Sequence, residues 1–264
     1  FSSYHIITTI GIMDTPMTFF VFLSIYFLIL FLKTGKYSLF LLTWISLGIS
    51  IMIKQIAMLF IPAFILFSLF YNKKNYQKFK VKQIFYAALI ILFMVTPVLT
   101  YNYLLYKDKG LVDMQFSRFF GIAKEQYASI AHTLNPFSLH SLFISYSEGN
   151  PSGLFTAFKF LYSFESIVIL LLSLPGIFLI AKSKNNFKWL LFLSFIFPFI
   201  FLAGTSLLPN HFVFVSLFVA LFSANGIYFF IEKFKKPENK IKVISFFVLL
   251  IIAGSIVQIY QENH

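Results

Sequence analysis

The chain has 264 residues, of which 59% are hydrophobic and only 11% charged, and its formal net charge is +12. A soluble domain carries about a quarter charged residues and about 45–50% apolar ones, so this composition excludes a soluble globular protein. The chain has no cysteine, which excludes disulfides, thiolate zinc sites and cysteine nucleophiles.

Apolar stretches long enough to cross a bilayer recur along the chain. A spanning helix needs about 20 apolar residues, with a lower limit near 17. Residues 1–13 are typical of the outer end of a span that starts further upstream. The predicted spans that follow are 16–32, 38–53, 55–71, 84–106, 163–181, 189–208, 211–231 and 241–260. We therefore expect an all-α fold, a polytopic transmembrane helix bundle of about eight spans plus part of another.

Lysine is concentrated in alternate connections between these spans. Connections 33–36, 72–82, 182–188 and 233–242, together with the adjoining Glu232, hold fifteen Lys against two Glu, whereas the rest of the chain holds six basic against seven acidic residues. Because cytoplasmic loops carry an excess of Lys and Arg, we expect a multi-pass protein of the cell membrane with these loops in the cytoplasm. Topology and anionic lipid explain the basic charge, so the lipid bilayer is an expected partner and nucleic acid is not.

The long connection 107–162 is predicted to be extracytoplasmic. Its apolar residues between 112 and 130 recur near helical spacing, which indicates an amphipathic helix lying in the membrane interface. Residues 154–161 follow a Gly- and Pro-containing break and are expected to lead back into the next span as a further juxtamembrane element. Loops longer than about 12–15 residues are often functional, but a lid that only covers the bundle also fits this pattern.

Asp14 stands at the outer boundary of the first complete span. Either Asp14 or Thr15 can cap the helix, with Pro16 in its first turn. An ionisable residue at a membrane boundary that faces a cavity is otherwise a candidate site residue. Both interpretations remain open from the sequence.

Lys54 interrupts the apolar run between the two short spans 38–53 and 55–71, which are predicted to form a tight helical hairpin. Its side chain could extend to the lipid headgroups. It could equally be a cation that binds a phosphate.

Three segments carry a resemblance to a known superfamily. The run Thr8–Asp14 is similar to the Asp-containing motif of protein O-mannosyltransferases. Gly48–Pro62 is similar to a Lys-containing hairpin of lipid A aminoarabinose transferases, and Leu208–His211, opening a span that ends at Ala224–Gly226, resembles their late helix. In this order the segments resemble the GT-C superfamily, integral-membrane glycosyltransferases that use polyprenyl-phosphate sugar donors.

The resemblance implies a polyprenyl-phosphate-sugar-dependent hexosyl- or pentosyltransferase. Residues 1–264 would be a single transmembrane glycosyltransferase-like domain, expected to be a fragment. It would move a sugar from a polyprenyl-phosphate donor to a hydroxyl of a protein, lipid or glycan acceptor on the extracytoplasmic side. The principal catalytic carboxylate of the family would then lie upstream of Phe1.

The chemistry of this transfer suggests roles for charged residues of the outer face. A carboxylate removes the acceptor proton, and fixed cations stabilise the departing lipid phosphate. Asp14 is the candidate catalytic residue, and it could orient either the acceptor or a cation. The candidate phosphate-binding residues are Lys54, Arg118, Lys124 and His211.

The chain departs from the family pattern at two positions. Thr9 stands five residues before the motif Asp, where family members often carry Arg, and His211 stands where Arg or Lys is expected. No cofactor is predicted, although some GT-C enzymes bind a divalent cation. No metal site is predicted either, because His132 and His140 are weak support for one.

Two other classes of membrane protein remain as alternatives. A membrane transporter or lipid-linked-sugar flippase would place ionisable residues near the bilayer midplane, often in repeated halves. The predicted spans are nearly free of charge at mid-depth and show no duplicated half. A non-catalytic membrane subunit is the other alternative, and the sequence favours the glycosyltransferase over both.

Overall fold

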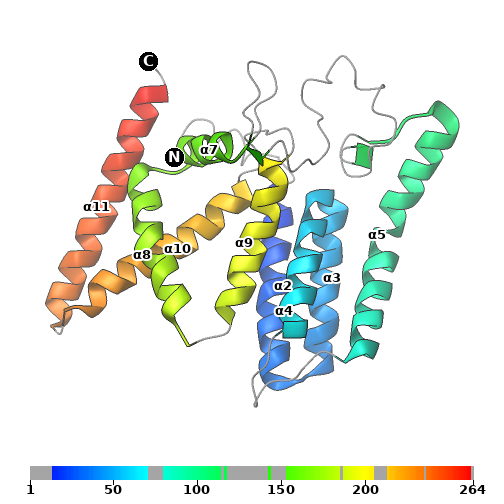
Figure 1. The fold of residues 1–264 in the computed structure, drawn as a ribbon, viewed down its shortest axis with the longest axis horizontal. Helices are drawn as coiled ribbons and strands as arrows, with labels where there is room; N and C mark the ends of the chain where they lie inside the picture. Colours follow the sequence, from blue (N-terminus) through cyan, green and yellow to red (C-terminus); the bar gives the residue numbers. More distant parts are fainter. Residues whose placement is uncertain are drawn as a thin grey trace.

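The computed structural model describes residues 14–70, 80–113, 116–117, 142–143, 153–184, 187–204, 213–234 and 236–262. Within these ranges the regular elements are helices and there is no strand (Figure 1). The predicted all-α fold class is therefore confirmed.

The helices follow the predicted spans closely. In chain order they are α2 (Asp14–Thr34), α3 (Tyr37–Ile53), the 3₁₀ turn η1 (Gln55–Leu59), α4 (Phe60–Phe70), α5 (Val81–Lys109), α7 (Leu154–Phe164), α8 (Ile167–Lys182), α9 (Phe187–Ala203), α10 (Val213–Glu232) and α11 (Pro237–Glu262). Among the helices of the described ranges, α2, α5, α10 and α11 are long and apolar enough to cross a membrane. The apolar helices α3, α8 and α9 and the continuous η1–α4 segment are shorter.

The chain between α7 and α8 differs from the prediction. The expected span 163–181 starts four residues too early, because α7 ends at Phe164 and α8 begins at Ile167. The hydroxyl of Ser166 accepts a hydrogen bond from the Ile169 amide at 3.4 Å and so caps α8. Consequently, α7 is a separate helix that lies across one end of the bundle (Figure 1).

Helices α2 and α3 pack side by side as an antiparallel pair. The turn between them uses Gly35 at φ 70°, whose amide donates to the Phe31 carbonyl at 2.7 Å. This left-handed conformation favours glycine and ends α2. Deeper in the pair, the Ser24 hydroxyl donates to the Thr43 carbonyl at 2.8 Å. The first residue of α2 and the last residues of α3 therefore lie at the same end of the bundle.

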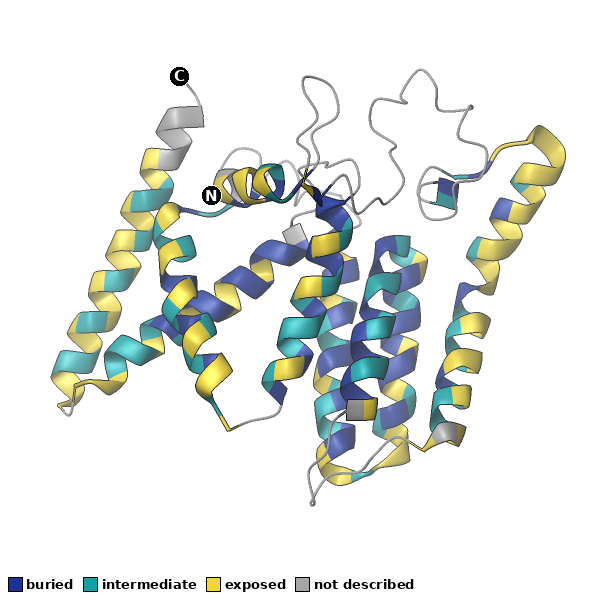
Figure 2. Cartoon of the chain, in the orientation of Figure 1, coloured by how far each residue is buried: buried dark blue, intermediate teal, exposed yellow. Residues whose placement is uncertain are grey.

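Buried side chains lie mainly where α2, α3, α4, α9 and α10 meet (Figure 2). The Phe60 ring of α4 lies 6.0 Å from the Phe214 ring and 6.3 Å from the Phe218 ring of α10. Helices α5 and α11 instead present apolar side chains outward, and Phe93 of α5 is 78% exposed. Such faces suit contact with lipid, in agreement with a membrane protein.

Helices α8 and α10 cross at very close range. A Cβ atom on Gly176 would lie 1.7 Å from the Phe222 carbonyl oxygen, and one on Gly226 would lie 1.9 Å from the Leu172 carbonyl oxygen. Small residues allow membrane helices to approach to backbone contact. The crossing fixes the C-terminal end of α8 beside the C-terminal half of α10.

Candidate functional site

The most conspicuous polar contact in the described part of the chain joins Asp14 to Lys54. The Lys54 ammonium lies 2.6 Å from Oδ1 and 2.7 Å from Oδ2 of Asp14. The exposed fraction is 0% for Asp14 and 9% for Lys54. The ion pair is therefore short, two-pronged and enclosed by the bundle.

Local backbone structure explains why Lys54 reaches this position. Helix α3 ends at Ile53, and Lys54 has an extended backbone with φ −153° and ψ 120°. Its amide still donates to the Ser50 carbonyl at 2.9 Å, while its carbonyl accepts from the Ala57 amide at 3.1 Å. Lys54 is thus the single non-helical residue between α3 and η1, which orients its side chain differently from those of its helical neighbours.

Asp14 is the first residue of α2, the antiparallel partner of α3. The Thr18 hydroxyl donates to the Asp14 carbonyl at 2.6 Å, one turn into the helix. An acidic side chain in the first helical turn is favoured by the helix dipole. Because the start of α2 and the end of α3 share one end of the bundle, the two charges meet.

The pair lies among apolar side chains. Met17, Ile51, Ile56 and Ala57, all close to Asp14 or Lys54 in the sequence, are at most 1% exposed. Moving two charges out of water costs roughly several kcal/mol of free energy per ion, and their mutual attraction only partly offsets this cost. A buried pair of this kind therefore needs a reason beyond stability, and ionisable residues in membrane bundles commonly mark functional sites.

The contact between Asp14 and Lys54 distinguishes a lysine that extends to the lipid headgroups from one that is held inside the bundle. An ammonium that extended to the headgroups would be exposed, whereas that of Lys54 is buried against Asp14. The sequence predicts Asp14 and Lys54 as separate candidates, without a contact between them. The available signal was the presence of isolated opposite charges at the same predicted boundary of two neighbouring antiparallel spans.

The other predicted site residues lie outside the described residues. These are Arg118, Lys124 and His211. His132, His140 and most of the predicted amphipathic helix between 112 and 130 also lie outside them. Within the ranges that the structure describes, no group of three His, Cys, Asp or Glu residues could hold a metal ion.

A second polar cluster, which sequence reasoning missed, anchors the start of the long connection to α5. The Asn102 side-chain amide donates to Asp113 Oδ2 at 2.5 Å, and the Asp113 amide donates to Asn102 Oδ1 at 2.8 Å. Asp113 Oδ1 also accepts from the Phe116 amide at 2.9 Å. Asn102 is buried, so this contact holds the beginning of 107–162 against the helix.

Glu165, in the break between α7 and α8, is a third polar residue of interest. Burial raises the pKa of Glu165 to about 7, although a hydrogen bond with Ser216 of α10 works in the opposite direction. A carboxyl group that titrates near neutrality is a candidate for proton transfer or for a pH-sensitive contact. No pattern in the sequence indicates this shift, because the burial of Glu165 depends on how α10 packs.

Comparison with known proteins finds one family model that is similar to the first part of the chain. Residues 2–101 match the family model of dolichyl-phosphate-mannose-protein mannosyltransferases. No curated protein and no solved structure matches the chain. The matched segment contains Asp14, Lys54 and the helices that position them. The match confirms the resemblance predicted from the motifs, that of a GT-C-type glycosyltransferase of the membrane.

Proposed function

We propose that the protein transfers a sugar from a polyprenyl-phosphate-linked donor to a hydroxyl of a protein, lipid or glycan. The transfer would occur at the end of the bundle opposite the lysine-rich connections. The observation that carries this proposal is the buried Asp14–Lys54 pair, which lies inside the segment that matches the mannosyltransferase family.

The chemistry of the departing group gives Lys54 its role. When the sugar leaves its carrier, negative charge develops on the lipid phosphate, and a fixed cation stabilises it. Lys54 is a cation held by the α3–η1 break rather than by a flexible loop. We therefore assign Lys54 to donor-phosphate binding, with Arg118, Lys124 and His211 as further candidates.

Asp14 is best suited to orienting this cation. Both carboxylate oxygens already face the Lys54 ammonium, so in this arrangement they do not face an acceptor. Asp14 would hold Lys54 in place and compensate its charge in the absence of donor. The carboxylate that deprotonates the acceptor hydroxyl is then a different residue.

The position of the pair also supports the proposal. Asp14 and Lys54 lie at one end of the α2–α3 hairpin, whereas Lys33 and Lys36 lie at the other. If the lysine-rich end faces the cytoplasm, the pair lies near the outer membrane boundary. The phosphate of a polyprenyl carrier is held at that depth because its chain is anchored in the bilayer.

Transfer assays on the full-length protein in proteoliposomes would test this assignment. Lys54→Gln should lower the rate of transfer from a polyprenyl-phosphate sugar by roughly 10²-fold, the usual effect of removing one group that stabilises developing charge. Lys36→Gln, an exposed lysine at the other end of the hairpin, is the matched control and should leave the rate unchanged. Wild-type transfer by a folded Lys54→Gln variant would refute the proposal.

A further inference from the structure

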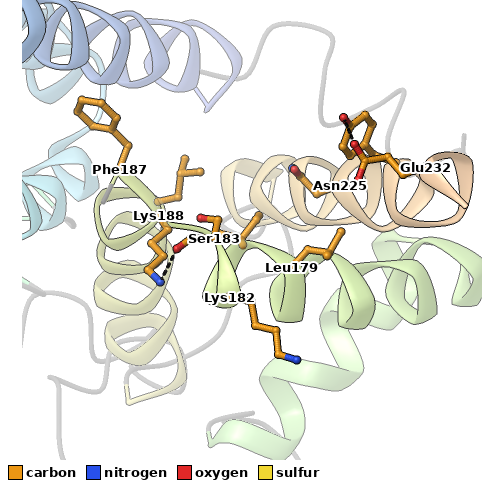
Figure 3. A pocket seen from close by; sticks show the side chains of 10 residues that line it. Leu179, Lys182, Ser183, Phe187, Lys188, Asn225 and Glu232 are labelled. Carbon is orange, nitrogen blue, oxygen red and sulfur yellow. Dashed lines mark hydrogen bonds between the residues drawn. The ribbon is translucent and has the colours of Figure 1, made fainter. Parts of the chain in front are cut away.

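A pocket of about 500 Å³, drawn in Figure 3, lies where the chain turns from α8 to α9 at the lysine-rich end of the bundle. Neither Asp14 nor Lys54 lines it. It is formed by the end of α8, the start of α9 and the C-terminal half of α10. Its polar lining residues are Lys182, Ser183, Lys188, Asn225, Tyr228 and Glu232. This volume lies within the range of about 300–1,000 Å³ that is usual for small-ligand sites.

One wall of the pocket holds a fixed cation. The Lys188 ammonium donates hydrogen bonds to the Ala181 and Ser183 carbonyls, the latter at 2.9 Å, and thereby caps the end of α8. An ammonium has three N–H donors, and these two carbonyls accept hydrogen bonds from only two of them. The stem of Lys182 lines the same wall, and its ammonium lies 4.3 Å from the centre of the Phe178 ring.

The opposite wall, contributed by α10, is polar without being basic. The Tyr228 hydroxyl donates to a carboxylate oxygen of Glu232, and the Asn225 side-chain amide donates to the Leu221 carbonyl at 2.8 Å. In Figure 3 Asn225 and Glu232 lie on α10, across from Ser183 and Lys188. A ligand that bridges the two walls needs an anionic group at one end and hydrogen-bond donors at the other.

The remaining lining is apolar. Leu179 and Ile180 of α8 and Leu191 of α9 contribute hydrocarbon surface beside the polar groups. The close crossing at Gly176 and Gly226 holds α8 and α10 together, so the pocket is part of the packed bundle. A charged edge, a polar wall and an apolar floor at the end of membrane helices match the headgroup and upper acyl chain of a phospholipid.

We propose that this pocket binds a phospholipid with one phosphodiester and a hydroxyl-bearing headgroup, of the phosphatidylglycerol type. The phosphodiester contacts Lys188, the headgroup hydroxyls donate to Asn225 and Glu232, and an acyl chain lies against Leu191. Basic pockets between helices at the lysine-rich side of membrane proteins bind acidic headgroups. The Glu232 carboxylate disfavours headgroups with several phosphates, because it repels additional negative charge. The proposal is independent of the sugar-transfer reaction.

Lipid retention by the full-length protein tests the proposal. The protein is incorporated into nanodiscs of equal phosphatidylglycerol and phosphatidylcholine, extracted, and its retained lipids are measured by native mass spectrometry. Wild type should retain phosphatidylglycerol preferentially, and Lys188→Gln should lower that preference by about tenfold, as expected for one charge-assisted hydrogen bond. Lys236→Gln, an exposed lysine outside the pocket, is the matched control and should behave as wild type.

A second variant separates recognition from a structural role of Lys188 at the end of α8. Glu232→Gln preserves the shape of the pocket but removes its negative charge, so retention of the doubly charged lipid cardiolipin should rise relative to phosphatidylglycerol. Inorganic phosphate should not displace the bound lipid. An unchanged cardiolipin ratio, displacement by phosphate alone, or wild-type lipid preference in Lys188→Gln would each overturn the proposal.

Discussion

The Lys54 ammonium contacts both carboxylate oxygens of Asp14, at 2.6 and 2.7 Å, across 40 positions of the sequence. The contact joins the first residue of α2 to the break between α3 and η1. It places a compensated pair of charges inside an apolar bundle. The contribution of this pair to sugar transfer and its contribution to folding stability can be measured in separate experiments.

Breaking the pair should cost more stability than replacing it. Asp14→Leu removes the carboxylate that compensates the buried Lys54 charge and should lower the free energy of unfolding by about 3–5 kcal/mol, whereas Asp14→Leu combined with Lys54→Met should recover most of that loss. Thermal denaturation of the purified variants in detergent measures both effects. Equal stability of the single and double variants would contradict a buried, coupled pair.

The stability of the protein should depend on pH through Glu165. Burial raises its pKa from 4.5 to about 7. Between these two pH values the folded state therefore binds a proton that the unfolded state has released. The contribution is fully present below about pH 4.5 and is lost as the pH rises through about 7. The melting temperature should therefore fall over this window in wild type, and the fall should be smaller in Glu165→Gln.

The matched control for this titration is Glu238→Gln at the start of α11, where the side chain is exposed. That variant should keep the pH dependence of wild type. A Glu165→Gln variant with an unchanged slope between pH 4.5 and 7 would show that another group titrates.

The contact between α8 and α10 should not tolerate a methyl group. Gly176→Ala would place a Cβ 1.7 Å from a backbone carbonyl oxygen, so the two helices must separate. We expect a loss of at least about 1–3 kcal/mol of stability, as for other overpacked sites. The matched control is Gly254→Ala in α11, whose Cβ would lie 3.1 Å from the Val168 Cγ2 methyl group. Since that methyl group needs to shift by only a few tenths of an ångström, a Gly254→Ala loss as large as that of Gly176→Ala would contradict the backbone clash as the cause.

The beginning of the long connection should loosen when Asn102 is replaced. Asn102→Leu removes both hydrogen bonds with Asp113 and leaves that carboxylate without this partner. Hydrogen bonds to charged groups contribute about 1.5–3 kcal/mol, so amide hydrogen exchange at Asp113 and Phe116 should accelerate. Thr96→Val is the matched control, because the Thr96 hydroxyl bonds only within its own helix, to the Leu92 carbonyl. Unchanged exchange in Asn102→Leu would show that other contacts hold the segment.

The positions of the helices could be predicted from the sequence because each span is a continuous apolar run of nearly the right length. The break at Glu165 and Ser166 could not, since apolar residues on both sides conceal it and only the Ser166 cap marks the new helix. Assignment of the lysine-rich side to the cytoplasm stays a prediction.

The candidate site could be predicted only as separate residues. Asp14 and Lys54 were identified by their unusual position in apolar segments, but their contact depends on how α2 and α3 pack. Burial of Glu165 likewise depends on α10, and the Asn102–Asp113 contact depends on the path of the chain after α5. Spacing along a sequence does not reveal contacts of this kind.

Lys54 is proposed to hold the phosphate of a lipid carrier. The most direct measurement is the affinity of the full-length protein for polyprenyl phosphate without a sugar, compared among wild type, Lys54→Gln and the exposed-lysine control Lys36→Gln. Lys54→Gln should bind at least about tenfold more weakly, as for the loss of one charge-assisted hydrogen bond, and Lys36→Gln should bind as wild type does. Equal affinity of wild type and a folded Lys54→Gln variant would contradict this proposal.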